Sequence, residues 1–478
     1  MYAITRRSLL ASAGASLVRG AGDAIDLGAR RELFVDGFLV DRMRDAAPRL
    51  HTPRPAGSAL VFDRPWEGVT SAIVTVFADS GRFRMYYRGS TNEDYVIASL
   101  LKPGEKAVAD HPQVTCYAES KDGIRWTRPD LGLVEFAGSK KNNILFQNVF
   151  SDTFAPFRDA NPAAPAEERY KGVATRAVGT RKYALFGLVS ADGLRWKQMQ
   201  QEPILTDGFF DTQNLVFWDT VRGRYFAFYR DFKDRIRSFK IATSDDFRHW
   251  TPGVWADFGD TPAEQIYTIA AQPYFRAPHI LLAFPRRFVL GRRFPEDSKI
   301  EGVSDVVFLS SRDGFHWNRG FLEAMLRPGI EERNWTHRSN APGAGLLDTG
   351  PNEVSMYVSR HISAPTHFLE RFTFRKDGFA SVYAGYRGGE MVTKPFRFQG
   401  SRLYLNYATS AVGHVRVELR DQQDRAIPGF TLADCPEMYG DRIEQAVPWK
   451  ASLAALAGRV VRLRVSLRDA DLFALEFR

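Results

Sequence analysis

Three acidic side chains precede short apolar segments that lie far apart in the sequence: Glu67, Asp211 and Glu264. Carboxyl groups held close together can divide acid and base work, because repulsion between like charges helps to keep one of them protonated near neutral pH. The protonated group donates its proton to a leaving oxygen, while an ionised one attacks carbon or activates water. Asp159 and Asp305 are two further acidic candidates for the same region.

Basic side chains follow other apolar segments of the chain. Four arginines end such segments and three more basic residues lie nearby: Arg88, Arg230, Arg286 and Arg360, with Arg287, His337 and Arg338. Guanidinium groups that converge on one site would suit a carboxylate, sulfate or phosphate group of a ligand. The alternative is that they pair with the acidic residues already named.

A repeated turn indicates which elements position these side chains. Its pattern is Ser-x-Asp-Gly-x-x-Trp, with phenylalanine replacing the glycine in one copy and the last copy lacking the tryptophan. The aspartates of the five copies are Asp122, Asp192, Asp246, Asp313 and Asp377. Their spacing of about 54 to 70 residues is too long for a helical solenoid repeat and suits a four-stranded propeller blade.

Each repeat also carries the signature of a β-hairpin upstream of the turn. Apolar segments of four to seven residues flank a polar turn within residues 76–88 and again within 216–230, as in adjacent buried antiparallel strands. The aspartate and glycine supply the hydrogen bonds and the positive φ of a tight turn, and the tryptophan packs between sheets. We therefore expect five blades and a structural role for the repeated residues.

Beyond the repeats, the turn pattern stops and the sequence contains short segments in which apolar and polar residues alternate. Residues 403–407, 415–419 and 460–465 have the period of two that is typical of half-buried strands. The fold class that we predict is all-β, with a five-bladed β-propeller over residues 25–388 followed by a C-terminal β-sandwich over residues 389–478. The sandwich would stabilise the propeller or, alternatively, bind carbohydrate.

Charge and cysteine content exclude several classes of protein. The net charge of +9 comes from 65 basic and 56 acidic residues among 478, and the basic residues are not concentrated as in most nucleic-acid-binding proteins. Cys116 and Cys435 are the only cysteines, too few for a zinc site or a disulfide framework. We expect no nucleic-acid partner.

The N-terminus has the pattern of a twin-arginine export signal. Thr5-Arg6-Arg7-Ser8-Leu9-Leu10 precedes a weakly apolar segment that ends near Val18, and cleavage would leave residues 1–24 as the signal peptide. The apolar segment is about half the roughly twenty residues that cross a bilayer. We predict a periplasmic or secreted protein with no membrane insertion; a cytoplasmic N-terminal tail is the alternative.

Five blades with this turn, followed by a β-sandwich, resemble the five-bladed propeller glycoside hydrolases of families 32, 43 and 68. The resemblance covers most of residues 60–478 and is one of architecture. Family 32 carries the short motifs Asn-Asp-Pro, Arg-Asp-Pro and Glu-Cys, none of which occurs here. Arg230-Asp231-Phe232 ends a second strand and is not an equivalent, so the resemblance is to a distant or separate family.

The resemblance implies an exported glycoside hydrolase whose funnel holds three acidic residues at one end of the central axis. First strands of blades start, and second strands end, at the funnel face, which would bring the acidic and basic residues together. We expect Glu264 to be the general acid, Asp211 to orient it or set its pKa, and Glu67 to be the nucleophile or base. No cofactor is expected, although a structural calcium or sodium ion on the axis occurs in similar propellers.

The substrate that the resemblance implies is a poly- or oligosaccharide, and the arginines favour an anionic one. Candidate contacts to sugar rings are Trp66, Tyr267 and Trp335, with Gln213 as a polar contact; each aromatic residue could equally be packing between blades. Two other functions stay open: a glycoside phosphorylase, in which the arginines hold inorganic phosphate, and a carbohydrate-binding propeller without activity. A sialidase is less expected, because its turn has one more residue than the turn found here.

Overall fold

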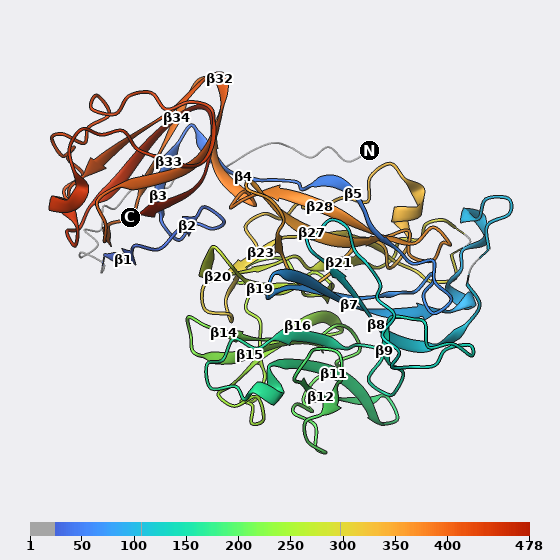
Figure 1. Cartoon of the computed structure of the whole chain (residues 1–478). Coiled ribbons are helices and arrows are strands. Elements are labelled where there is room, and N and C mark those ends of the chain that lie inside the picture. Colours follow the sequence, from blue (N-terminus) through green and yellow to red (C-terminus); the bar gives the residue numbers. More distant parts are fainter. Residues whose placement is uncertain (1–23, 107, 297) are drawn as a thin grey trace.

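The computed structural model describes residues 24–106, 108–296 and 298–478, and its regular elements are almost entirely β-strands (Figure 1). The helical elements are five short 3₁₀ turns: η1 (Glu93–Tyr95), η2 (Ala98–Leu100), η3 (Ala166–Glu168), η4 (Glu332–Trp335) and η5 (Leu453–Leu456). The predicted all-β class is confirmed. In the described part of the chain, none of the helices has the length and apolar character needed to span a bilayer. The predicted export signal lies outside the described residues, apart from Ala24.

Four sheets have antiparallel strands side by side in chain order, which is the meander of a propeller blade; in the fourth, two strands of another sheet intervene in the sequence. Sheet 1 contains β6 (Ala72–Asp79), β7 (Arg82–Thr91), β8 (His111–Ser120) and β9 (Ile144–Phe146). Sheet 2 contains β10 (Ala155–Arg158), β11 (Tyr170–Gly179), β12 (Lys182–Ser190) and β13 (Lys197–Gln198). Sheet 3 contains β14 (Leu215–Asp219), β15 (Arg224–Lys233), β16 (Ile236–Ser244) and β17 (Val254–Trp255). Sheet 4 contains β19 (Ala271–Tyr274), β20 (Ala277–Ala283), β23 (Leu309–Ser311) and β24 (Trp317–Asn318).

A small additional sheet is formed by strands that precede sheet 4 or interrupt it in the sequence. It consists of β18 (Ile266–Thr268), β21 (Arg286–Val289) and β22 (Val303–Val306), with β21 in the middle. In the antiparallel register, Thr268 of β18 lies opposite Arg286 of β21. Five of the residues named from the sequence therefore lie on or next to an insertion that the repeat pattern did not reveal: Glu264, Tyr267, Arg286, Arg287 and Asp305.

Sheet 5 joins the two ends of the repeat region. Its strands are β25 (Ala341–Pro342), β26 (Leu347–Asp348), β27 (Glu353–Arg360), β28 (Phe368–Arg375) and, at the edge, β5 (Arg54–Val61). Val61 of β5 pairs with Phe368 of β28 across some three hundred residues of sequence. An N-terminal strand thus completes the last sheet, so that the start and the end of the repeat region are hydrogen-bonded to each other.

The repeated turn has the structural role that the sequence predicts. In the first copy, Oδ1 of Asp122 accepts hydrogen bonds from the backbone N–H groups of Ile124 and Arg125, both at 2.8 Å. The hydroxyl of Ser120 accepts one from the N–H of Gly123, whose φ is 70°. The same aspartate contacts recur at Asp192, Asp246 and Asp313. Each of these side chains therefore satisfies backbone donors that the tight turn leaves without partners.

The tryptophans of the turns pack between sheets, as the second copy illustrates. Trp196 lies edge-on to Phe154, which directly precedes β10, with ring centroids 4.8 Å apart, and to Tyr86 of sheet 1 at 6.3 Å. The hydroxyl of Tyr86 in turn donates to the carbonyl of Gly193 in the turn, at 2.9 Å. The turn thus fastens one sheet to its neighbour by both apolar and polar contacts.

The C-terminal strands form an eight-stranded sheet that also contains N-terminal strands. Its members are β2 (Glu32–Leu33), β3 (Val40–Arg44), β4 (Ala46–Leu50), β29 (Ala380–Ala384), β30 (Gly389–Thr393), β32 (Leu403–Arg420), β33 (Asp441–Ala446) and β34 (Arg462–Phe477). Beside it, β1 (Ile25–Gly28) pairs in parallel with β31 (Phe396–Phe398). Figure 1 shows the blue N-terminal strands among the orange and red strands of this part, to one side of the meander sheets.

This pairing corrects the predicted domain boundary. Residues 25–50, and β29 before residue 389, are predicted to belong to the propeller, but residues 32–50 and β29 lie in the C-terminal sheet, where β4 and β34 both pair with β29, and β1 lies beside it. The apolar residues Leu27 and Phe34 belong to the same buried core as Leu405 and Val417. A local sequence pattern identifies a strand and its buried face, but not a partner that lies hundreds of residues away.

Candidate functional site

A pocket of about 540 Å³ lies where the sheets meet, and we call it the funnel pocket. Its wall comes from the first strands, or the loops before them, of sheets 1, 2, 3 and 5, from the ends of the second strands of sheets 1 and 5, and from the inserted sheet. Among the residues that line it are Thr70, Arg88, Tyr95, Asp152, Asp211, Gln213, Tyr267, Thr268, Arg286, Arg338 and Ser359. A volume of this size is within the usual range for small-molecule sites.

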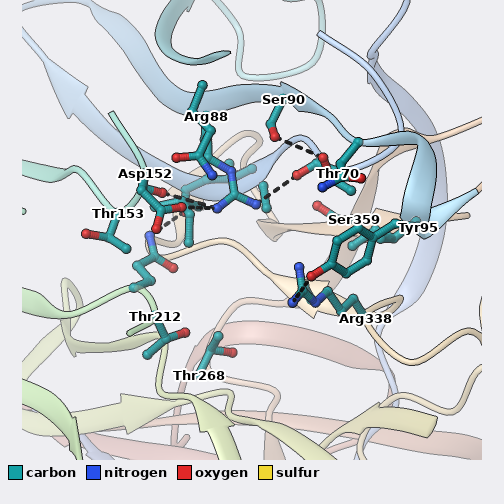
Figure 2. Close-up of a pocket in the computed structure, with 18 of the residues that line it drawn as sticks. Thr70, Arg88, Ser90, Tyr95, Asp152, Thr153, Thr212, Thr268, Arg338 and Ser359 are labelled. Carbon is teal, nitrogen blue, oxygen red and sulfur yellow. Dashed lines mark hydrogen bonds and ion pairs between the residues drawn. The ribbon is translucent and has the colours of Figure 1, made fainter. Parts of the chain in front are cut away.

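Arg88 and Asp152 form one side of the funnel pocket (Figure 2). The Arg88 guanidinium donates to Oδ1 of Asp152 at 2.5 Å and to the carbonyl oxygen of Thr70 at 2.8 Å. The Asp152 side chain is 41% exposed, so its carboxylate meets both an arginine and the pocket. The last strand of the first hairpin, β7, and the loop before β10 thus hold a carboxylate that a ligand can reach.

Asp211 is the second carboxylate of the pocket wall. It stands in the loop before β14, and its Oδ2 accepts a hydrogen bond from Arg230 at 3.1 Å. The Asp211 side chain is 51% exposed while that of Arg230 is buried. Beside it, the side-chain amide of Gln213 donates to Thr75 and to the carbonyl oxygen of Val74, both at 2.9 Å. Gln213 therefore joins the loop to sheet 1, and the Asp211 carboxylate stays open to the pocket.

Arg286 lies deep in the wall without an acidic partner. Its guanidinium donates to the carbonyl oxygen of Arg338 at 2.8 Å, its Nε has no partner, and it makes no ion pair with any described carboxylate. Burial lowers the pKa of Arg286 to about 10, with further lowering by Arg338 and Arg230. Thr268, its partner in the strand register, also has a buried hydroxyl without a hydrogen-bond partner among the described residues. Unpaired buried polar groups of this kind are costly unless something binds them.

Arg338 faces the pocket from the loop that follows η4. Figure 2 shows its guanidinium beside Tyr95, with the Arg338 Cζ 4.6 Å from the ring centroid and a nitrogen 3.4 Å from the hydroxyl. The neighbouring His337 is buried, and burial together with the charges of Arg338 and Arg286 lowers its pKa to about 3. Arg338 is thus a second cation of the pocket that, among residues 24–106, 108–296 and 298–478, has no ion pair.

Glu67, predicted as the nucleophile or base, does not line the funnel pocket. Its carboxylate is fully buried and accepts hydrogen bonds from the Tyr87 hydroxyl at 2.6 Å and from Nε of Arg128 at 2.9 Å. A further bond from the N–H of Arg64 reaches its other oxygen at 3.1 Å. Burial raises the pKa of Glu67, opposed by Arg128. The side chain anchors the loop before β6 to sheet 1 and has no free face for a ligand.

Glu264 and Asp305 do not line the funnel pocket either, although the sequence predicts them to lie there with Asp211. Both pair with Arg287, whose nitrogens lie 2.6 Å from an oxygen of each, and Glu264 also pairs with Arg319 at 3.1 Å. Successive residues of a strand point to opposite faces. In β21, Arg286 faces the pocket and Arg287 faces this separate cluster.

Asp159 does not line the funnel pocket either, and the acidic residue of this repeat that does line it is Asp152. The Asp159 side chain is buried, pairs with Lys171 at 2.7 Å and accepts from the Tyr225 hydroxyl at 2.6 Å. The sequence of this repeat is the least regular, and the pattern does not reveal its first strand β10. Because β10 begins at Ala155, the acidic residue that precedes the first strand is Asp152, whereas Asp159 follows its end.

Three further residues that were predicted to contact the substrate are bonded to other groups of the protein. Trp66 donates to Asn143 at 2.7 Å and packs edge-on to Phe136, while Trp335 donates to the carbonyl oxygen of Gly329 at 2.8 Å. Arg360 is buried against Asn340 and Glu370. None of the three lines the funnel pocket, and Arg230 lies behind its wall, where it donates to Asp211 and lies close to the Tyr267 ring. The residues that the structure brings together from the predicted set are Asp211, Gln213, Arg88, Arg286, Arg338 and Tyr267.

The charges of the pocket are unequal. Three arginines line it against two carboxylates, and Arg230 and Arg237 stand close behind the wall, with Cζ atoms 5.3 Å from the Tyr267 ring centroid. Such an excess of positive charge in a recessed site attracts anions. Within the described residues, no cluster of three His, Cys, Asp or Glu side chains could hold a metal ion.

No protein-family model and no curated protein matches this sequence. Several solved structures are similar to it. A glycoside hydrolase family 43 arabinoxylan arabinofuranohydrolase from Bacillus subtilis is 10% identical with a TM-score of 0.38, over 87% of this protein and 96% of that one. An α-L-arabinofuranosidase from Clostridium thermocellum is 11% identical with a TM-score of 0.39, over 66% and 92%. An N-acetylgalactosamine deacetylase from F. plautii is 13% identical with a TM-score of 0.39, over 71% and 96%.

Family 43 glycosidases are thus among the structural neighbours, as the sequence resemblance leads us to expect. The neighbours also include a deacetylase. At 10–13% identity and TM-scores below 0.5, these three do not assign an activity to this protein. The function has to be argued from the funnel pocket.

Proposed function

We propose that this protein is a glycoside hydrolase that cleaves a glycosidic bond of an acidic poly- or oligosaccharide in the funnel pocket. The observation that carries the proposal is that Asp152 and Asp211 line one pocket from two neighbouring sheets, each about half exposed. Two carboxylates that flank a bound sugar can supply a nucleophile or a base for water. In this proposal Asp211 and Asp152 replace the predicted pair of Glu67 and Glu264.

The anionic character of the substrate is supported by Arg286 and Arg338. Both lie at the pocket without an ion pair among the described residues, and Arg286 is deeply buried. A carboxylate or sulfate on the sugar would accept charge-assisted hydrogen bonds from these guanidinium groups and a further one from the Thr268 hydroxyl. Such a group would neutralise part of the excess positive charge, which a neutral sugar would leave uncompensated.

The test is a hydrolysis screen of the purified protein on matched pairs of neutral and acidic glycans. Release of reducing sugar from uronic acid-containing or sulfated glycans, and not from their neutral counterparts, is the expected result. Asp211→Asn and Asp152→Asn should each lose this activity. Binding of acidic glycans without any release would instead support the carbohydrate-binding function.

A glycoside phosphorylase is the second candidate, and the same unpaired arginines favour it. Inorganic phosphate is a small anion that fits between guanidinium groups. In that case sugar release requires phosphate and yields a sugar phosphate. The screen is therefore run with and without phosphate, and release that is independent of phosphate favours the hydrolase.

Export is part of the proposal and rests on the sequence Arg6-Arg7 ahead of a short apolar segment. A polysaccharide does not cross a bacterial membrane unaided, so an exported enzyme would meet its substrate outside the cytoplasm. Replacing both arginines by lysine should retain the protein in the cytoplasmic fraction of cells, since twin-arginine export recognises the arginine pair. Unchanged export of that variant would contradict this part.

A further inference from the structure

The funnel pocket has two carboxylates, and neither of them is an obvious proton donor. Asp152 and Asp211 each accept a charge-assisted hydrogen bond from an arginine, a contact made by the ionised form. Glu264, the general acid predicted from the sequence, is held by Arg287 and Arg319 outside the pocket. Cleavage of a glycosidic bond needs a proton at the leaving oxygen unless the leaving group is already a good one. Another group of the pocket has to supply it.

Tyr267 has the position and the freedom for that task. It belongs to β18, lines the pocket together with Asp211, and has no hydrogen-bond partner for its hydroxyl among the described residues. Other tyrosines of the sheets have such a partner, as Tyr87 does in Glu67 and Tyr229 does in Asp207. The Tyr267 hydroxyl is therefore available to a ligand.

Guanidinium groups surround the Tyr267 ring. The Cζ of Arg286 lies 4.1 Å from the ring centroid, and those of Arg230 and Arg237 lie 5.3 Å from it. Burial raises the pKa of Tyr267, but the charges of Arg338, Arg286 and Arg230 outweigh burial and hold the pKa below its ordinary value, while Asp211 opposes them. Positive charges that surround a phenol stabilise the phenolate that forms when it gives up its proton.

We propose that Tyr267 donates the proton to the leaving glycosidic oxygen, which rests on the proposed hydrolase function. The Tyr267 O–H bond breaks and its proton passes to the glycosidic oxygen as the bond between that oxygen and the anomeric carbon breaks. In one route, the carboxylate of Asp211 or Asp152 first forms an ester with the anomeric carbon; water then attacks that carbon, the ester bond breaks and releases the carboxylate, and the Tyr267 phenolate takes the proton of the water. In the other route, water attacks the anomeric carbon directly and gives its proton to Asp211 or Asp152. The proton then returns to the phenolate through water, which restores Tyr267 and a carboxylate.

Tyr267→Phe tests the proposal because it removes only the hydroxyl. The phenylalanine keeps the ring on which the guanidinium groups stack, and the lost hydroxyl has no partner among the described residues, so the variant should fold with an unchanged Tm. Two substrates with the same acidic sugar are compared: one with a sugar as the leaving group and one with a nitrophenol. Tyr404→Phe, on β32 in the C-terminal sheet, is the matched control.

On the sugar leaving group, Tyr267→Phe should lower kcat by about a hundredfold or more, the usual loss for a general acid. On the nitrophenyl glycoside, whose leaving group needs no proton, the loss should be below about threefold. A variant that loses both activities equally, or neither, would overturn the proton-donor role. Wild-type protein that cleaves no glycan at all would overturn the hydrolase proposal itself, so the two failures are distinguishable.

The pH profile is the second readout, which a merely structural role would not move. As the pH rises through the lowered pKa of Tyr267, the donor ionises, and kcat/KM of the wild type on the sugar leaving group should fall. The groups that face Tyr267 and set this pKa are Arg230, Arg237, Arg286, Arg338 and Asp211. The residual activity of Tyr267→Phe should lack the alkaline fall. An alkaline fall that persists unchanged in the variant would contradict the assignment.

Discussion

Arg286 and Arg287 are consecutive residues of β21, yet they belong to two different sites. Arg286 lines the funnel pocket without an acidic partner among the described residues, whereas Arg287 pairs with Glu264 and Asp305 on the other face of the inserted sheet. The alternation of side chains along a strand imposes this separation. It explains why Glu264, which is close in sequence to the pocket-lining Tyr267, does not line the pocket.

Arg286→Met should weaken binding of an acidic glycan and leave binding of its neutral counterpart unchanged. Charge-assisted hydrogen bonds contribute about 1.5–3 kcal/mol, so the dissociation constant for the acidic ligand should rise roughly ten- to hundredfold. Because Arg286 is buried without an ion pair to any described residue, its removal should not lower the Tm. Calorimetric titration with both ligands measures the difference. Equal weakening for the neutral and acidic ligands would contradict an anion subsite.

Asp122→Ala should lower the free energy of unfolding by about 1–3 kcal/mol, because it leaves the N–H groups of Ile124 and Arg125 without an acceptor. Urea titration followed by tryptophan fluorescence gives the value. Lys121→Ala, one residue earlier and exposed, is the control and should change stability by less than about 0.5 kcal/mol. Identical stabilities of the two variants would refute the role of the aspartate as a turn anchor.

The turn aspartates should make the protein sensitive to acid. Backbone N–H groups of Arg125 and Ile124 hold the pKa of Asp122 below its ordinary value, and the pKa of Asp192, Asp246 and Asp313 is lowered as well. A lowered folded-state pKa gives stability that is present above the unfolded value of about 3.9 and is lost as the pH falls through the folded value. The difference in Tm between wild type and Asp122→Ala should therefore shrink below about pH 4. A difference that stays constant would argue against this linkage.

The contact between the C-terminal sheet and the meander sheets should depend on Arg31. Its guanidinium is buried and pairs with the fully buried Asp377, the aspartate of the fifth turn, at 2.8 Å, and with Glu444 at 2.7 Å. Arg31→Met leaves these charges with fewer partners, chiefly Arg276, and should cost about 3 kcal/mol. Arg44→Met, which breaks the exposed pair with Glu390, should cost less than about 1 kcal/mol. Thermal unfolding compares the two, and equal losses would contradict the importance of the buried cluster.

The sequence was a good guide where the determining contacts are local. Asp122 and its counterparts act within three residues, so the turns and the hairpins they follow could be predicted, and the rule for strand ends led to Asp211, Arg88 and Arg286. It was a poor guide where partners are distant or local patterns are weak. The pairing of β5 with β28 and the place of residues 32–50 in the C-terminal sheet depend on contacts across hundreds of residues.

The misassigned carboxylates follow from the same limitation. Glu67 and Glu264 precede strands as Asp211 does, but each is neutralised by arginines that come from elsewhere in the sequence, Arg128 in one case and Arg287 with Arg319 in the other. Asp152 was missed because β10 is only four residues long in an irregular repeat. Spacing locates a residue along a strand, but exposure decides whether its side chain is open to a ligand: Asp152 and Asp211 are ion-paired as well, yet they remain 41% and 51% exposed.

A side-by-side assay of Asp211→Asn and Glu264→Gln decides whether the carboxylates of the funnel pocket carry the reaction. Both variants replace one carboxylate oxygen by nitrogen at an ion-paired residue before a strand, and only Asp211 lines the pocket. On an acidic glycan, Asp211→Asn should lower kcat about a hundredfold or more, while Glu264→Gln should stay within a few-fold of wild type. Loss of activity in Glu264→Gln with full activity in Asp211→Asn would show that the reaction takes place elsewhere.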